Sequence, residues 1–244
     1  MKKVSTLLKL SLVAVLIVCG TKASAQTNIT SIAEFKAANA KIDDLSQVIC
    51  AGKNVILSLP TPDANTTYTW SSRFPSDDGT GTGVPVPAAV AGVVTDTPPA
   101  AGYYTYMLTV TNTLSQCTEA YPTTVFVLPS PTLVITPPTD AVGCTNATED
   151  FAFTSVASNN TAAGLSFPLD YQWFYKNGTG AEVAVANSNA ATFTATGLTA
   201  TIGDYKVYAR ATFKLKACTL SESNQADISI KAAPTKPTVT IASN

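Results

Sequence analysis

The sequence predicts an all-β protein of two tandem β-sandwiches, each with one internal disulfide, preceded by a short N-terminal helix. Apolar and polar residues alternate in many short segments, turn-forming residues separate these segments, and a pattern of Cys, Trp, Gly and Tyr occurs twice. Short alternating segments joined by turns are typical of a sandwich. We divide the chain into a signal peptide at 1–25, a helical segment at 26–46, modules at 47–130 and 131–233, and a tail at 234–244.

The clearest strand signal runs from Lys206 to Lys216. Its odd positions are apolar and its even positions are mostly polar, so we expect one buried and one exposed face. The range 103–110 alternates in the same way in the first module. Further strands are predicted at 54–59, 66–71, 123–128, 132–136, 150–156, 171–176, 191–196 and 226–231.

The first 25 residues have the features of a secretion signal. Lys2 and Lys3 give a basic start, an apolar run follows, and Ala23 and Ala25 form a small-x-small cleavage pattern. We therefore expect an exported protein whose mature chain begins at Gln26 and does not span the membrane. A transmembrane anchor is the alternative, but the uninterrupted apolar stretch is shorter than the ~20 residues that cross a bilayer.

A short helix is predicted between this signal and the first sandwich. Ser31 and Glu34 have the spacing of a capping box, and Ile32 and Phe35 share one helical face. Two arrangements are open: the helix docks on the first sandwich, or it remains a mobile arm.

Composition excludes several classes of function. The chain has no His, which excludes imidazole-based catalysis and His-ligated metals. Removing residues 1–25 takes away four Lys and leaves 11 basic and 16 acidic residues, a net charge of −5, so no nucleic-acid partner is expected. We find no Ser-x-x-Lys pattern, no phosphate-binding loop and no Cys/His metal spacing, and we expect no enzyme activity, cofactor or metal.

Of the five cysteines, Cys19 lies in the predicted signal peptide, and the other four belong to a sequence repeat. In both copies a Cys follows a Gly by 15 residues, a Trp lies upstream of that Gly, and another Cys lies upstream of the Trp. The copies are Cys50, Trp70, Gly102, Tyr104 and Cys117, and Cys144, Trp173, Gly203, Tyr205 and Cys218. Four cysteines allow three pairings, and one copy per module predicts Cys50–Cys117 and Cys144–Cys218. Each bridge would contribute roughly 4 kcal/mol in the chain-entropy model.

The Trp on the third strand and the Gly-x-Tyr that opens the sixth strand resemble an immunoglobulin-type sandwich with its tyrosine corner. The Cys-Thr at the start of the last strand, Cys117-Thr118 and Cys218-Thr219, is similar to Ig-like and PKD-like modules of bacterial surface adhesins and gliding-associated proteins of the Bacteroidetes type. This resemblance implies two Ig-like modules that work by contact at a cell surface.

Several residues are of types that could form a binding site. Trp70 and Trp173 could stack on sugars, but we interpret them as core residues together with Tyr104 and Tyr205 of the tyrosine corners. Asp77-Asp78 could hold Ca²⁺, but the spacing favours a plain turn.

A second candidate is the outward face of the third and sixth strands in module 2. If Trp173 points inward, alternation places aromatic and basic side chains together on the other face. Such a face suits an acidic glycan or an acidic protein, although a solvated strand face with edge lysines is the plainer interpretation. Its members are Phe174, Lys176, Lys206, Tyr208, Arg210, Lys214 and Lys216.

The tail repeats the start of the second module. Pro237-Thr-Val-Thr-Ile241 is similar to Pro131-Thr-Leu-Val-Ile135, the predicted first strand of that module. Three interpretations are open: a fragment of a longer repeat protein, a tail that folds back, or a strand donated to a neighbouring copy.

We therefore predict a non-enzymatic protein of the outer cell surface, or secreted, that serves adhesion or structural assembly with protein or glycan partners. The alternative is a carbohydrate-binding accessory module that recognises polysaccharide.

Overall fold

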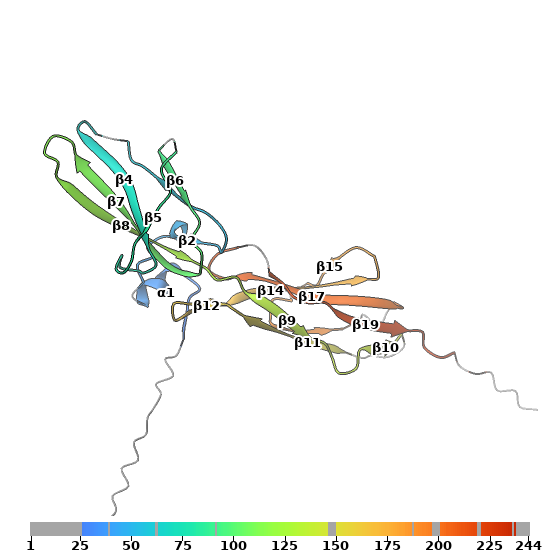
Figure 1. Cartoon of the computed structure of the whole chain (residues 1–244). Coiled ribbons are helices and arrows are strands. Elements are labelled where there is room, and N and C mark those ends of the chain that lie inside the picture. The colour runs from blue at the N-terminus through green and yellow to red at the C-terminus, as the bar shows by residue number, and fades with distance from the viewer. Residues whose placement is uncertain are drawn as a thin grey trace, which may run out of the picture.

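The computed structural model describes residues 26–237 except 39, 62, 91, 146–149, 187, 197–200, 219–220 and 236. The predicted signal peptide and most of the predicted tail therefore lie outside the described residues. Figure 1 shows two β-sandwich modules in an elongated molecule, with the N-terminal segment at the joint between them. The immunoglobulin-like all-β fold is as predicted, and within the described part of the chain no helix is long and apolar enough to cross a membrane.

Module 1 is a sandwich of a five-stranded sheet in the order β2-β8-β7-β4-β5 and a two-stranded sheet, β3-β6. Tyr104, Tyr106 and Val125 of the larger sheet and Val55 and Leu57 of the smaller one form its apolar cluster. The strands are β2 (Val48–Ile49), β3 (Val55–Ser58), β4 (Thr66–Phe74), β5 (Val84–Pro85), β6 (Val93–Asp96), β7 (Gly102–Asn112) and β8 (Thr118–Val127).

Module 2 repeats this plan with two further strands, one in each sheet. Its larger sheet has the order β10-β19-β17-β14-β15, with β18 paired to β17, and its smaller sheet has the order β16-β11-β9. The strands are β9 (Thr132–Thr136), β10 (Val142–Cys144), β11 (Phe151–Ser158), β14 (Leu169–Asn177), β15 (Val183–Ala184), β16 (Thr192–Ala195), β17 (Gly203–Phe213), β18 (Ser221–Glu222) and β19 (Ala226–Lys231).

The N-terminal segment docks on both modules. Helix α1 (Ile32–Ala37) begins with the predicted capping box, and the short 3-10 helix η1 (Leu45–Gln47) leads into β2. Phe35 is fully buried, with its ring centroid 5.3 Å from that of Phe126 in module 1 and 6.0 Å from that of Phe167 in module 2. Before the helix, β1 (Thr27–Asn28) pairs in parallel with β13 (Leu165–Ser166), which also pairs with β12 (Thr161–Ala162).

A third apolar cluster fills the joint. It contains Phe35, Val48 and Phe126 from the N-terminal part of the chain and Phe167 and Leu215 from module 2, all buried. The two modules therefore share a hydrophobic core at their point of contact.

The predicted disulfide pairing is wrong. The structure has a single bridge among its described cysteines, between Cys50 of module 1 and Cys218 of module 2, with Cα atoms 5.6 Å apart. Cys117 and Cys144, which the sequence pattern assigned to intramodule bridges, are free. The reason is the direction of the strands: Cys50 follows β2 at the joint, whereas Cys117 lies in the β7–β8 turn at the far end of the same module (Figure 1).

Candidate functional site

The repeated Trp and Tyr residues occupy equivalent places in the two modules. The Tyr104 hydroxyl donates to the Ala100 carbonyl at 3.0 Å, and the Tyr205 hydroxyl donates to the Thr201 carbonyl at 3.0 Å. Both bonds reach back four residues, as in a tyrosine corner. Trp173 is fully buried beside Phe153, which is the core position expected for it.

Trp70 differs from Trp173 in its surroundings. The Trp173 indole N–H donates to the Ala190 carbonyl at 2.9 Å, whereas the Trp70 N–H is buried without an acceptor among the described residues. Trp70 is only half-buried and lies at the border of the module 1 cluster. An unpaired buried donor is costly, so this side of the module 1 core is less complete than its counterpart in module 2.

The smaller sheets of the two modules explain this difference. In module 2, β11 pairs with β16 on one side and with β9 on the other. Ile135 of β9 is buried in the same apolar cluster as Trp173. In module 1, the equivalent strand β3 pairs with β6, and no strand of the described chain lies along its other edge. The side chain of Ile56 on β3 is 67% exposed.

The candidate binding face forms around Tyr208. Because β14 and β17 are neighbours, Phe174 lies opposite Tyr208, with ring centroids 5.7 Å apart. The Arg210 guanidinium lies 4.6 Å from the Phe174 centroid and 5.4 Å from that of Tyr208, and Lys176 lies 5.8 Å from the Tyr208 centroid. These cations cover Tyr208, which is only 2% exposed despite its place on the outward side of the alternating pattern.

Acidic side chains compensate most of the positive charge on this face. Arg210 pairs with Glu182 at 2.7 Å and with Glu222 at 2.8 Å. Lys206 pairs with Asp227 at 2.9 Å, and Lys214 lies 3.7 Å from Asp170. The alternation gave no signal for Glu182, because it precedes β15 and reaches Arg210 only when that strand folds back on β14.

Hydrogen bonding joins Tyr208 to the same cluster, because its hydroxyl donates to the Glu182 carboxylate. This bond and the bonds from Arg210 lower the pKa of Glu182, which therefore stays ionised. Burial, together with the bond to Glu182, raises the pKa of Tyr208 to about 12. The face is thus a closed network of compensated charges around a covered aromatic ring.

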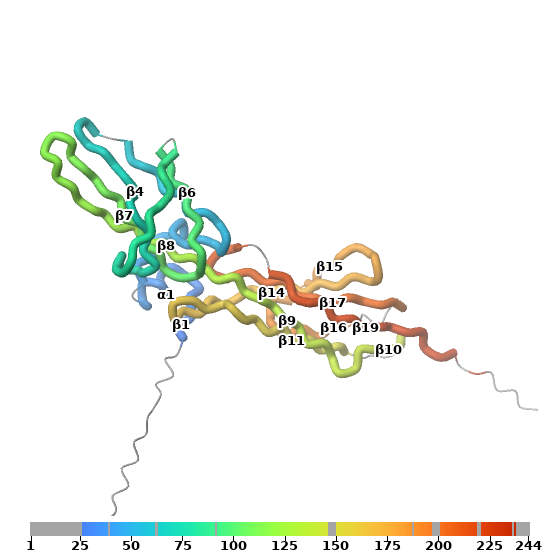
Figure 2. The backbone as a smooth tube through the Cα atoms, in the orientation of Figure 1, coloured from blue at the N-terminus to red at the C-terminus, as the bar shows by residue number. Residues whose placement is uncertain are grey.

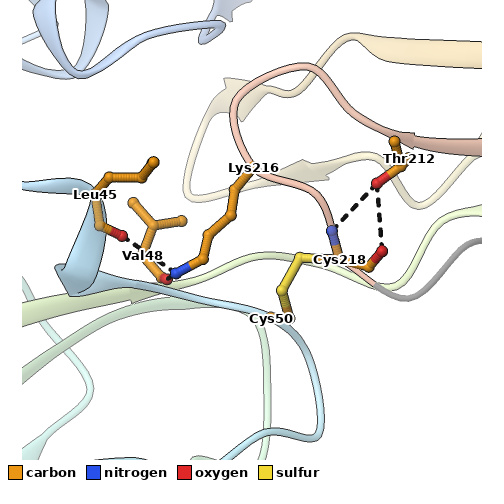
Figure 3. The surroundings of a disulfide bond; sticks show 6 residues. All are labelled: Leu45, Val48, Cys50, Thr212, Lys216 and Cys218. Carbon is orange, nitrogen blue, oxygen red and sulfur yellow. Dashed lines mark hydrogen bonds between the residues drawn. A yellow bond between two sulfur atoms is a disulfide. The ribbon is translucent and has the colours of Figure 1, made fainter.

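Lys216 belongs to the joint and not to this face. Figure 3 shows its ammonium group directed at the backbone of η1 and β2, where it donates to the carbonyl of Leu45 at 3.2 Å and to that of Val48. The bridge from Cys50 to Cys218 lies beside these bonds. The Thr212 hydroxyl accepts from the Cys218 N–H at 3.1 Å. This bond holds Cys218, which follows β17, close to the end of that strand.

Module 1 contains a buried ionic group that the sequence analysis did not find. The Arg73 guanidinium donates to both carboxylate oxygens of Asp96 at 2.8 and 2.7 Å, and the Tyr106 hydroxyl donates to Asp96 at 2.7 Å. The side chains of Arg73 and Asp96 are 13% and 9% exposed. Burial and the bond to Asp96 raise the pKa of Tyr106. This group joins the larger sheet to β6 of the smaller one.

The Asp77-Asp78 turn has a local role. The Asp78 carboxylate accepts from the backbone N–H of Thr80 at 3.0 Å and from its hydroxyl at 2.7 Å, which lowers the pKa of Asp78. Among the residues that the structure describes, no group of three acidic, Cys or His side chains is placed to hold a metal ion.

Comparison with solved structures returns distant likenesses. No known protein family and no curated protein matches the sequence. Fibronectin(III)-like modules of Clostridium thermocellum CbhA are 15% identical over 80% of this chain and 94% of that chain, with a TM-score of 0.33. Three domains of the outer capsid protein Hoc of bacteriophage RB49 are 16% identical over 76% of this chain and 56% of that chain (TM-score 0.32). An I-band fragment of titin is 11% identical over 77% of this chain and 62% of that chain, with a TM-score of 0.36. Likenesses at this level carry no argument about function.

Proposed function

We propose that this protein is an exported, non-enzymatic subunit of a structural assembly at the cell surface. The observation that carries the proposal is the edge of β3 along which no strand of the described residues lies, where module 2 has β9. An uncovered strand edge is a template for pairing with another chain. We infer that residues 238–241 of a second copy add to this edge.

The chemistry of the tail matches the missing strand. In β9 the alternate residues Leu133 and Ile135 are buried and Val134 points outward. In the tail, Val239 and Ile241 have the spacing of Leu133 and Ile135, and each segment begins with Pro-Thr. Laid along β3, this segment would place its apolar residues toward the half-buried Trp70.

Both ends of such a contact are accessible. The chain leaves β19 at the end of module 2 that is remote from the joint, and module 1 occupies the opposite end of the molecule (Figure 2). A tail that leaves one end and adds to the other gives head-to-tail contacts between identical copies. Contacts of this type form open chains when the rotation between copies does not close a ring.

Export is part of the proposal and rests on the N-terminal signal pattern and the disulfide. Disulfides form and persist in oxidising compartments. The closed charge network around Tyr208 supports a structural role for that face, since Glu182 and Glu222 already occupy the guanidinium of Arg210. The polysaccharide-binding alternative therefore has less free positive charge to use than the sequence suggested.

Deletion of residues 234–244 tests the assembly. The exported chain, carrying Cys117→Ser and Cys144→Ser to exclude covalent contacts, should form larger species as its concentration rises in sedimentation velocity. The truncated chain should remain a monomer at every concentration. A control with Thr238→Ser and Thr240→Ser keeps the apolar pattern and should associate like the parent. Equal association of the truncated and parent chains would rule out strand donation.

A further inference from the structure

Each module carries one cysteine in the turn between its sixth and last strands. Cys117 follows Gly102 by 15 residues, and Cys218 follows Gly203 by 15 residues. Both Gly residues begin the corresponding strand, β7 or β17. The two turn cysteines are therefore equivalent.

The other two cysteines are also equivalent, which the sheet register shows. Gly102 lies opposite Val127, and Ile49 of β2 lies beside the same Val127. Gly203 lies opposite Ile230, and Gly143 of β10 lies beside the same Ile230. Cys50 follows Ile49 and Cys144 follows Gly143. Both therefore lie next to the end of the last strand of their module.

The observed bridge joins one cysteine of each kind across the joint: the strand-end Cys50 of module 1 and the turn Cys218 of module 2. The free cysteines are the complementary pair, the strand-end Cys144 of module 2 and the turn Cys117 of module 1. They lie at opposite ends of the elongated molecule, so they cannot meet within one copy (Figure 2).

Two pairs of equivalent apolar residues also show that the free ends resemble the two sides of the joint. Leu215, 12 residues after Gly203, is 7% exposed in the joint, whereas its equivalent Leu114 is 77% exposed. Val48 of β2 is fully buried in the joint, whereas its equivalent Val142 of β10 is 53% exposed. Each free end thus presents a cysteine and one apolar residue that are equivalent to a cysteine and an apolar residue at the joint.

We propose that copies of this chain are joined end to end by a disulfide from Cys144 of one copy to Cys117 of the next, in the same relation as Cys50 and Cys218 at the internal joint. The inference rests on the head-to-tail order of the proposed function and adds the covalent bond to it. At the internal joint, Cys50 lies where the chain leaves β8 and crosses to become β9. Cys144 lies opposite Lys231, where the chain leaves β19 toward the tail.

The covalent bond has a physical reason. Burying two aliphatic side chains of a donated strand is favourable, but ordering its four residues costs a comparable free energy. The added backbone hydrogen bonds contribute little each, so the donated strand alone holds two copies weakly. A disulfide keeps the copies together in an oxidising compartment.

The reaction is an ordinary thiol oxidation. The Cys144 and Cys117 thiols lose two protons and two electrons as the S–S bond forms, and a disulfide compound or a thiol oxidoreductase accepts them and becomes a dithiol. Cys117 is exposed and Cys144 is partly exposed, so both are accessible to such an oxidant.

Mixing two variants tests the bond. The exported full chain is prepared as Cys117→Ser, which keeps Cys144, and as Cys144→Ser, which keeps Cys117. Both carry Cys19→Ser, so that uncleaved material adds no thiol. Each variant alone, and then the mixture, is oxidised in a glutathione buffer, and the products are resolved on non-reducing gels and mapped by peptide mass spectrometry.

We expect each variant alone to remain a monomer that retains Cys50–Cys218, and the mixture to give a dimer with the single intermolecular peptide pair Cys144–Cys117. The parent chain should give a ladder of oligomers that collapses to monomer on reduction. The inference fails if the mixture stays monomeric under conditions that form Cys50–Cys218, or if each variant alone dimerises as readily as the mixture.

Two further variants separate this bond from strand donation. Leu114→Thr should slow the cross-link several-fold, and Val156→Thr, at a residue 58% exposed on β11 and away from both ends, should not. In the chain lacking residues 234–244, a Cys144–Cys117 cross-link that forms as fast as in the parent chain would support the disulfide and show that strand donation does not contribute to it. Association that requires the tail but yields no Cys144–Cys117 peptide would support strand donation and rule out the disulfide.

Discussion

At the scale of single residues, the buried Arg73–Asp96–Tyr106 group is the clearest example of a polar core feature in module 1. Asp96 receives two bonds from Arg73 and one from Tyr106, so its carboxylate is satisfied although it is nearly buried. Buried ion pairs of this kind contribute little compared with apolar packing, but the loss of one partner leaves an uncompensated buried charge.

Asp96→Ala should therefore lower the free energy of unfolding by about 3–5 kcal/mol, because it leaves the buried Arg73 guanidinium without its carboxylate partner. The measurement is urea denaturation followed by circular dichroism. Asp227→Ala is the matched control, since it removes an ion pair whose Lys206 and Asp227 side chains are 44% and 75% exposed, and it should change stability by at most ~1 kcal/mol. Similar losses in both variants would contradict this account.

At the scale of elements, the difference between β3 and β11 matters most. The two strands are equivalent, but only β11 has a partner on both sides within the described chain. The residues that precede module 1 form α1 and η1 and fill the joint. The segment before module 1 therefore connects the modules and does not complete its own sandwich.

A synthetic peptide of residues 234–244 should bind the truncated chain at the β3 edge and shift Trp70 emission to shorter wavelength, because the added strand covers the half-buried indole. Trp173→Phe in the truncated chain leaves Trp70 as the only source of tryptophan emission. A peptide with Val239→Asp and Ile241→Asp should give no shift. A shift of equal size with both peptides would contradict docking through the apolar residues.

At the scale of the whole molecule, the joint combines a shared apolar cluster, the Lys216 bonds to module 1 and the Cys50–Cys218 bridge. The bridge connects cysteines 168 residues apart, and the chain-entropy model assigns roughly 5 kcal/mol to a loop of this length. It restricts how the two modules move against each other.

Replacing both Cys50 and Cys218 with Ser should lower the urea midpoint of the monomer under non-reducing conditions and separate the unfolding of the two modules into distinct transitions. Cys117→Ser with Cys144→Ser is the control and should leave the monomer midpoint unchanged, because neither residue is bridged within one copy. An unchanged midpoint without the Cys50–Cys218 bridge would show that the apolar joint alone couples the modules.

The local features of this protein could be predicted from its amino-acid sequence. The period-two alternation located most of the longer strands but not β6: β9 and β19 have the predicted bounds, and β17 alternates as expected except at Tyr208. The capping box at Ser31 and Glu34 located α1. These features could be predicted because strand pleat and helix capping depend on neighbouring residues only.

Which distant groups meet depends on how the strands and modules are arranged in three dimensions. The repeat showed where the cysteines lie, but the direction in which strands cross each sandwich places Cys50 and Cys117 at opposite ends of one module, and the joint brings Cys50 to Cys218. The same holds for the charges, since Glu182 neutralises Arg210 only because β15 folds back on β14. A disulfide or an ion pair needs two groups a few ångströms apart, and spacing along the chain does not encode that distance.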